Sequence, residues 1–237
     1  MQRYFVDKKN DDNFYLNSDD SYHFIKVMRA NSGESVEIVY NKKLFLGKLI
    51  KADLKESIIK TSKEIDLNDI NYNISIAQAL VVEQKFNTIL QKCTELGAKE
   101  IIPLEVSRSK INLDKKVDKK VERWQKIVKE ASSQSKRIDI PKVKNICNIK
   151  ELIAGEYDHK FLCSVNEKSK TIKMVLQNMQ SCDKILFVVG PEGGFTDYEE
   201  ELLMTSGFIR ISLGDLVLRT ETASIAILSM VNYHFMR

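Results

Sequence analysis

A change of hydrophobic periodicity near residue 70 constrains the fold of this chain more than any other feature. Before it, short alternating stretches such as SVEIVY (35–40) and KLFLGKLIKA (43–52) are separated by polar turns. This pattern predicts a small antiparallel β-barrel or sandwich. After about residue 72, strand-like segments alternate with helix-like segments. That alternation predicts an α/β domain with a mostly parallel sheet covered on both faces.

The second region divides into ten expected elements. Apolar runs predict strands at 74–80, around Ile101 and Ile102, and at 160–165, 184–190 and 208–213. Helical spacing predicts helices over 83–98, near 170–180, over 197–206 and over 222–235. A further long helix carries the apolar stripe Val117, Val121, Trp124, Val128 and Ala131, so we expect Trp124 to lie in the core.

Positive charge is concentrated in one segment. Residues 108–144 carry thirteen Lys and Arg against five Asp and Glu, whereas the whole chain has a formal net charge of only +4. Such a segment indicates either a patch for a polyanion such as nucleic acid or a solvated helix face.

The cysteines and the hydropathy limit the other function classes. Cys93, Cys147, Cys163 and Cys182 lie far apart and lack the paired spacing of a zinc site, so we expect buried thiols in a reducing compartment and no metal. No apolar run approaches the roughly 18 residues that a membrane span requires. We therefore expect a cytoplasmic protein that does not bind membranes.

Glycines cluster at two expected loops. Five of the nine glycines fall between Gly190 and Gly214, and four of these five lie in GPEGGFT (190–196) and LGDLVLRTET (213–222). Both loops follow strands and lead into helices, which is where open α/β sheets bind ligands. The sequence contains neither of the phosphate-binding glycine motifs G-x-x-x-x-G-K-[ST] and G-x-G-x-x-G. In addition, Glu192 and the acidic DYEEE segment that follows would repel a diphosphate. The loops therefore favour an uncharged or cationic ligand over a nucleotide phosphate.

Together, FVVGPEGGFTDYEE and LGDLVLRTETASIA resemble the paired C-terminal motifs of the SPOUT methyltransferases, specifically the bacterial family that methylates N3 of a uridine in 16S ribosomal RNA. QKCTELGAKEIIPLEVSRS and KEASSQSKRIDIP are similar to further segments of that family, in the same order. RYFV and HFIKVMRANSGE resemble its N-terminal RNA-binding domain. The resemblance thus covers essentially the whole chain.

This resemblance implies a two-domain fold and a cofactor. Residues 1–70 would form a PUA-like β-barrel that binds RNA, and residues 71–237 a SPOUT-type α/β domain whose last segment is threaded into a trefoil knot. S-adenosylmethionine would bind within the knotted loops of a homodimer. The substrate would be 16S ribosomal RNA or the small ribosomal subunit, methylated in the decoding-centre region.

The resemblance also assigns roles to residues at the two loops. We expect Arg219 to stabilise the negative charge that develops on uracil as N3 loses its proton, although a salt bridge to Glu221 or another carboxylate is the structural alternative. Glu221 is a candidate proton acceptor, and a carboxylate at a helix N-terminus is equally well explained by the helix dipole. The expected cofactor-binding residues are Gly190, Glu192, Gly193, Leu213, Gly214, Leu218, Thr220 and Thr222. Leu213 and Leu218 are alternatively core residues, and the two threonines alternatively helix caps.

Methylation at N3 requires an unpaired or flipped-out uridine, because N3 lies on the pairing edge of the base. We therefore expect phosphate contacts around the target. The candidates are Arg3, Arg29, Arg108, Lys110, Arg137 and Lys142. Where the family carries a lysine-rich segment, around ALVVEQKF, this chain retains Lys85.

Two other functions stay open from the sequence. One is a different SPOUT reaction, such as ribose 2′-O methylation of RNA. The other is a non-catalytic RNA-binding or ribosome-assembly protein that retains the fold. The intact GPEGGF and LRTETA segments favour a functional cofactor site.

Overall fold

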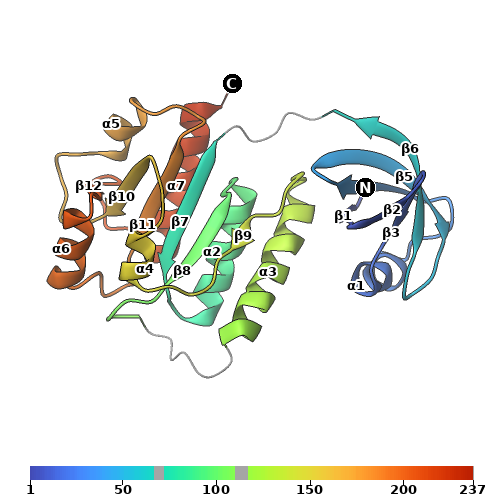
Figure 1. Cartoon of the computed structure of the whole chain (residues 1–237), viewed down its shortest axis with the longest axis horizontal. Helices are drawn as coiled ribbons and strands as arrows, with labels where there is room; N and C mark the ends of the chain where they lie inside the picture. Colours follow the sequence, from blue (N-terminus) through green and yellow to red (C-terminus); the bar gives the residue numbers. More distant parts are fainter. Residues whose placement is uncertain (67–71, 110–116, 237) are drawn as a thin grey trace. The chain divides into compact units, whose positions relative to one another are not determined.

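The structure is a computed structural model that describes residues 1–66, 72–109 and 117–236. The chain divides into two units, residues 1–69 with 132–139 and residues 70–131 with 140–237 (Figure 1). No helix of the described residues is both long and apolar enough to cross a bilayer.

The first unit is built around a six-stranded sheet with the strand order β1-β4-β5-β6-β3-β2. Its elements are β1 (Arg3–Phe5), β2 (Lys8–Asn10), β3 (Asn13–Tyr15), α1 (Ser18–Tyr22), a π-helix η1 (His23–Val27), β4 (Ser35–Tyr40), β5 (Lys43–Lys51) and β6 (Ile58–Ile65). All pairs are antiparallel, as expected, except β1 with β4, a parallel pair that the sequence did not predict. The sheet is curled (Figure 1). The buried cluster of this unit includes Phe14, Phe24 and Ile38. The sequence did not predict α1 and η1.

The second unit contains a six-stranded parallel sheet with the order β12-β10-β11-β7-β8-β9. Its strands are β7 (Asn73–Ala79), β8 (Glu100–Leu104), β9 (Lys142–Val143), β10 (His159–Cys163), β11 (Lys184–Val189) and β12 (Ile209–Ile211). Its helices are α2 (Glu83–Glu95), α3 (Val117–Gln134), α4 (Ile149–Ile153), α5 (Ile172–Leu176), α6 (Asp197–Thr205) and α7 (Thr220–Phe235). The expected parallel α/β arrangement is confirmed. The expectation missed β9 and α4, and the helix expected near 170–180 is only five residues long.

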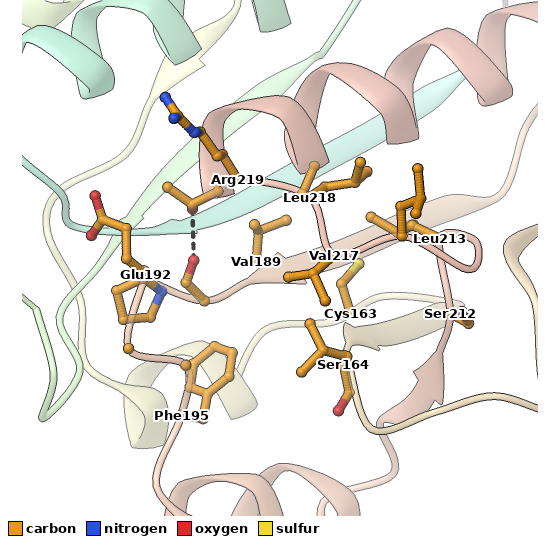
Figure 2. Close-up of a pocket in the computed structure, with 18 of the residues that line it drawn as sticks. Cys163, Ser164, Val189, Glu192, Phe195, Ser212, Leu213, Val217, Leu218 and Arg219 are labelled. Atoms are coloured by element: carbon orange, nitrogen blue, oxygen red, sulfur yellow. Dashed lines mark hydrogen bonds between the residues drawn. The ribbon is translucent and has the colours of Figure 1, made fainter.

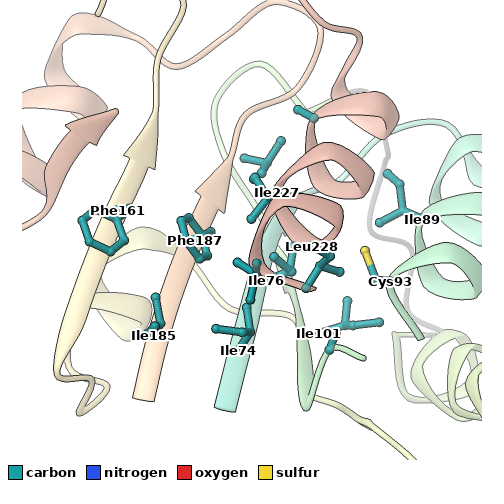
Figure 3. Close-up of a cluster of buried hydrophobic side chains, with 14 of the residues drawn as sticks. Ile74, Ile76, Ile89, Cys93, Ile101, Phe161, Ile185, Phe187, Ile227 and Leu228 are labelled. Carbon is teal, nitrogen blue, oxygen red and sulfur yellow. The ribbon is translucent and has the colours of Figure 1, made fainter. Parts of the chain in front are cut away.

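Helices cover both faces of this sheet, because its strands are apolar on both sides. On one face, β7 and β11 pack against α2, α3, α5 and α7 through a cluster that includes Ile76, Phe187 and Ile227 (Figure 3). Trp124 of α3 lies in this cluster, as expected, and is 2% exposed. On the other face, Leu186 and Val188 pack against α4 and α6.

The strand order brings three loops to one edge of the sheet. The strands β12, β10 and β11 are neighbours and run parallel, so their carboxyl ends meet there. The segment that follows β12 is held by the connection between β10 and β11, since the Ser212 amide donates to the Lys170 carbonyl at 2.8 Å and the Ile172 amide to the Ser212 carbonyl at 2.9 Å. The chain then returns as α7 against α2 and β11.

The four cysteines are all free, but the expectation that all are buried was wrong. Cys93 is fully buried, whereas Cys182 is exposed. Burial raises the pKa of the Cys93 and Cys163 thiols to about 12, which leaves both protonated at neutral pH.

We predict that Ile76→Ala lowers the free energy of unfolding by about 2–5 kcal/mol, because Ile76 is fully buried in the sheet that carries the three loops. Ile209→Ala is the matched control, since Ile209 in β12 is 38% exposed, and its expected cost is about 1 kcal/mol or less. Urea denaturation measures both. Equal costs for the two variants would contradict the packing described for β7.

Candidate functional site

A cavity of about 450 Å³ lies where the loops after β10, β11 and β12 meet (Figure 2). This volume is within the range of small-molecule sites, about 300–1,000 Å³. The wall at β10 consists of Cys163, the last residue of the strand, and of Ser164, Val165 and Lys168 in the loop after it. The wall at β11 consists of Val189, the last residue of the strand, of Gly190, Pro191, Glu192, Gly193, Gly194 and Phe195 in the loop after it, and of Glu200 in α6. The wall after β12 consists of Ser212, Leu213, Gly214, Leu216, Val217, Leu218 and Arg219, followed by Thr220 and Ala223 of α7.

The structure brings together most of the residues expected to hold a cofactor. Gly190, Glu192, Gly193, Leu213, Gly214, Leu218 and Thr220 line the cavity together with Arg219, whereas Glu221 and Thr222 do not line it. Leu213 and Leu218 also pack against the main hydrophobic cluster, as their alternative role of core residues requires, and their contact with a cofactor stays a prediction. The sequence interpretation missed the loop after β10, although the rule that ligands bind at the carboxyl ends of strands applies to it equally.

The loop after β11, GPEGGFT (190–196), is the glycine loop, and it has a defined shape. The Gly194 amide donates to the Pro191 carbonyl at 2.9 Å, and Gly194 has a φ of +67°, a conformation that glycine adopts most easily. At Gly190, a Cβ atom would lie 3.0 Å from the Phe195 ring, so a larger residue would push against that buried side chain. The glycines at 190, 193 and 194 therefore bring backbone to the cavity, next to Pro191, Glu192 and Phe195 of the same loop.

Two side chains outside the loop fix its conformation. The Arg108 guanidinium donates from Nη1 to the Gly193 carbonyl at 2.7 Å and to the Phe195 carbonyl at 3.1 Å. The Glu199 carboxylate, which is 5% exposed, accepts hydrogen bonds from the Ser107 amide at 2.7 Å and from the Thr196 amide at 2.8 Å. With the Thr196 hydroxyl accepting from the Glu199 amide, these contacts complete the capping box expected at the start of α6.

The carboxylates near the cavity are paired. Glu192 Oε1 lies 2.6 Å from Lys85 Nζ, which also lies 3.9 Å from Glu221 Oε2. Glu200 pairs with Arg210 at 2.9 Å. The Glu192 carboxylate, which supported the expectation of an uncharged or cationic ligand, thus also pairs with Lys85, and that expectation stays a prediction. The cavity itself is lined by apolar side chains and by glycines. The apolar side chains suit the face of an adenine ring, and the backbone at the glycines suits its polar edge.

Arg219 is exposed and carries no ion pair to a described residue, so the alternative salt bridge to Glu221 is absent. It occupies the N-cap position of α7. Its guanidinium is therefore available to a substrate. Cys163 also lines the cavity, and burial raises the pKa of its thiol to about 12.

The structure separates the candidate phosphate ligands into two groups. Arg29, Arg108 and Lys142 are exposed. Arg3 and Arg137 are buried: Arg3 pairs with Glu37 at 2.9 Å and donates to the Arg137 carbonyl at 3.0 Å, and Arg137 pairs with Asp139 at 2.8 Å. These contacts give Arg3 and Arg137 a structural role. Lys110 lies outside the described residues.

Among the described residues, no cluster of three or more His, Cys, Asp and Glu is arranged to hold a metal ion.

Comparison with known proteins identifies the family. Residues 68–232 match the model of the RNA methyltransferase domain. The chain is 32% identical to the ribosomal RNA small subunit methyltransferase E of Bacillus subtilis over 249 residues, covering 98% of this chain and 96% of that protein. The chain belongs to the ribosomal RNA small subunit methyltransferase E family.

Two solved structures are similar over nearly the whole length. The putative methyltransferase of Legionella pneumophila, solved in complex with S-adenosylmethionine, has 27% identity and a TM-score of 0.90, and covers 98% of this chain and 97% of its own. The ribosomal RNA small subunit methyltransferase E of Neisseria gonorrhoeae, bound to S-adenosylmethionine, has 27% identity and a TM-score of 0.87 with the same coverage. These similarities confirm the expected fold, a PUA-like curled half-barrel followed by a parallel α/β domain. The trefoil knot stays a prediction.

We predict that Glu199→Gln lowers the free energy of unfolding by about 1.5–3 kcal/mol at pH 7, because the lost charge weakens the hydrogen bonds from Ser107 and Thr196. Burial raises the pKa of Glu199, but these hydrogen bonds outweigh it and hold the pKa below the ordinary value of 4.5. The stabilisation by the carboxylate is therefore complete above pH 4.5 and is lost as the pH falls through the folded-state pKa.

The difference between wild type and Glu199→Gln, measured by urea denaturation, should shrink as the pH falls below 4.5. Glu201→Gln in the same helix is the control, since residue 201 is exposed and its substitution should have little effect at any pH. A difference for Glu199→Gln that stays constant at low pH would contradict this account.

Proposed function

We propose that this protein transfers a methyl group from S-adenosylmethionine to N3 of a uridine in 16S ribosomal RNA, in the decoding-centre region of the small ribosomal subunit. One observation carries the proposal: the two loops with family motifs line a single cavity in a chain that belongs to a ribosomal RNA methyltransferase family. Since ribosomal RNA is the substrate, the protein would work in the cytoplasm.

The cavity suits S-adenosylmethionine in size and chemistry. The apolar side chains of Leu213, Leu218 and Val189 would face the adenine, and backbone groups of Gly190 and Gly193 would bind its polar edge. Two relatives of the same fold bind this cofactor. When bound, it supplies an electrophilic methyl group on a sulfonium, and the remaining task of the protein is to position and activate the uracil.

Arg219 is our proposed catalytic residue. As uracil loses its N3 proton, negative charge spreads over the neighbouring carbonyl oxygens, and a guanidinium beside them stabilises that charge. Arg219 lines the cavity, is exposed and has no ion-pair partner among the described residues. Glu221, two residues further on, is the proposed proton acceptor, and its carboxylate lies near Lys85 outside the cavity lining.

Phosphate binding would use the exposed cations. We propose Arg29, Arg108 and Lys142, because their side chains are exposed and phosphate contacts dominate the affinity of RNA-binding proteins. Arg108 would have a second role here, because it also holds the glycine loop.

The primary test is a primer-extension assay on small-subunit RNA from cells with and without this protein. N3 methylation blocks base pairing, so we expect a stop in the decoding-centre region only when the protein is present. A stop that persists without the protein would contradict the proposal. A 2′-O-methylated nucleotide would indicate the alternative SPOUT reaction.

We predict that Arg219→Ala lowers the methylation rate at saturating substrate by about 10²–10³-fold, as expected for removal of one charge-stabilising donor, with little change in cofactor affinity. Lys184→Ala is the control: it also removes one positive charge, but at the first residue of β11, the opposite end of the strand from the cavity. Single-turnover methylation and calorimetric titration of the cofactor measure the two quantities. Normal methylation by Arg219→Ala would refute the assignment.

We also propose a homodimer. Leu216 and Val217, which follow one another in the cavity lining, are 81% and 76% exposed, and Tyr233 of α7 is 81% exposed. Neighbouring exposed apolar side chains such as Leu216 and Val217 are typical of a protein interface. We predict that the wild type sediments as a dimer and that Val217→Asp shifts it toward the monomer in analytical ultracentrifugation. A wild type that sediments as a monomer at micromolar concentration would contradict the dimer.

A further inference from the structure

A buried polar network joins three elements that meet at the cavity. Gln78 of β7 is fully buried, as is Ser224 of α7, and Thr220 of α7 is 5% exposed. Gln78 Nε2 donates to Thr220 Oγ1 at 2.8 Å, Ser224 Oγ donates to Gln78 Oε1 at 2.6 Å, and Thr220 Oγ1 donates to the Gly190 carbonyl at 2.6 Å. A single amide thus connects the central strand, the last helix and the glycine loop.

The hydrogen bonds fix one direction along this network. The Gly190 carbonyl can only accept, so the Thr220 proton points to it and the Thr220 oxygen is left to accept from the Gln78 amide. The second Gln78 amide proton goes to the Ala79 carbonyl at 3.1 Å. Both polar atoms of the Gln78 side chain are therefore satisfied. Losing one member would leave buried partners without hydrogen bonds, which costs more than the pair itself is worth.

The position of Gln78 is one where an apolar side chain would be expected. Ile74 and Ile76, on the same face of β7, lie in the main hydrophobic cluster. A fully buried amide costs free energy unless it is hydrogen-bonded. Apart from the Ala79 carbonyl of its own strand, the partners of Gln78 are Thr220 and Ser224 of α7. The hydrogen bonds of the Gln78 side-chain amide therefore fix the position of the start of α7.

The start of α7 sets where Arg219 lies. Arg219 is the N-cap residue, and its side chain makes no capping hydrogen bond to the helix. The next residue, Thr220, is held on one side by Gln78 and bonded on the other to Gly190, the first residue of the glycine loop. The spacing between the proposed catalytic arginine and the proposed cofactor loop therefore depends on two hydrogen bonds that share one hydroxyl.

We infer that Gln78 is a positioning residue for methyl transfer: through Thr220 it fixes Arg219 relative to the glycine loop at Gly190. The inference rests on the proposed function of the cavity. It also gives Thr220 a structural role within the cofactor site, since its hydroxyl is already used by Gln78 and Gly190.

The test uses Gln78→Met, which keeps the length of the side chain and removes its donors and acceptor. We expect the single-turnover methylation rate at saturating cofactor and RNA to fall by about 10²-fold, the effect of a misplacement of about 1 Å in a catalytic constellation. Cofactor affinity, measured by calorimetry, should change far less. Adding Thr220→Val to Gln78→Met should slow the reaction little further, because both substitutions remove the same link.

Thr94→Val is the matched control. Thr94 of α2 is fully buried, and its hydroxyl donates to the Leu90 carbonyl at 2.7 Å, away from the cavity. This variant should lower the melting temperature without changing the methylation rate. If Gln78→Met lowers the melting temperature but methylates at the wild-type rate, Gln78 is merely structural and the inference is wrong. Additive effects of Gln78→Met and Thr220→Val would also overturn it.

Ser224→Ala provides a second route if Gln78→Met does not fold. Removing the Ser224 hydroxyl leaves Gln78 free to turn, so we expect a smaller loss of rate in the same direction, and an unchanged rate would overturn the inference. A wild-type protein that binds S-adenosylmethionine but methylates no ribosomal RNA would instead refute the proposed function. The two failures are therefore distinguishable.

Discussion

The parallel pairing of β10 with both β11 and β12 is the constraint on which the rest of the site depends. Because the three strands run in the same direction, their carboxyl ends open at one edge of the sheet. The chain leaves that edge three times, and the three departing segments form the walls of the cavity. No single segment carries the site, which explains why each motif alone is a weak indicator of function.

Polar contacts then give these segments a fixed geometry. Arg108 holds the glycine loop by its carbonyls, and Glu199 holds the turn that leads into α6. Gln78 ties the start of α7 to the same loop through Thr220. The residues proposed to do chemistry are thus few, and more side chains serve to hold the backbone where a cofactor would contact it.

Much of the fold could be predicted from the sequence, because long apolar runs and helical spacing are local signals. The strands β7 and β11 and the helices α2 and α6 fall within a few residues of their expected bounds. The π-helix η1, the two-residue strand β9 and the five-residue α4 are too short to have a period of their own. The parallel pairing of β1 with β4 is a contact across the chain that no local pattern records.

The same limit applies to the site. The loops at 190–196 and 213–222 are recognisable from the sequence, because they combine glycine, which is sparse in this chain, with segments that resemble family motifs. The cavity wall after β10 contains ordinary residues such as Ser164 and Val165, and the ion pair of Lys85 with Glu192 joins residues 107 positions apart. Gln78 is conspicuous as a polar residue in an apolar strand, but its role is not evident until its partners on α7 are known. Pairings of this kind depend on the tertiary structure.

The central claim is tested most directly by incubating the purified protein with S-adenosylmethionine and small-subunit ribosomal RNA, and by mapping the modified nucleotide by mass spectrometry. We expect one methyl group on the base of a single uridine, at N3, and no product when the cofactor is omitted. A methyl group on a ribose, or cofactor binding without any methylated RNA, would contradict the account.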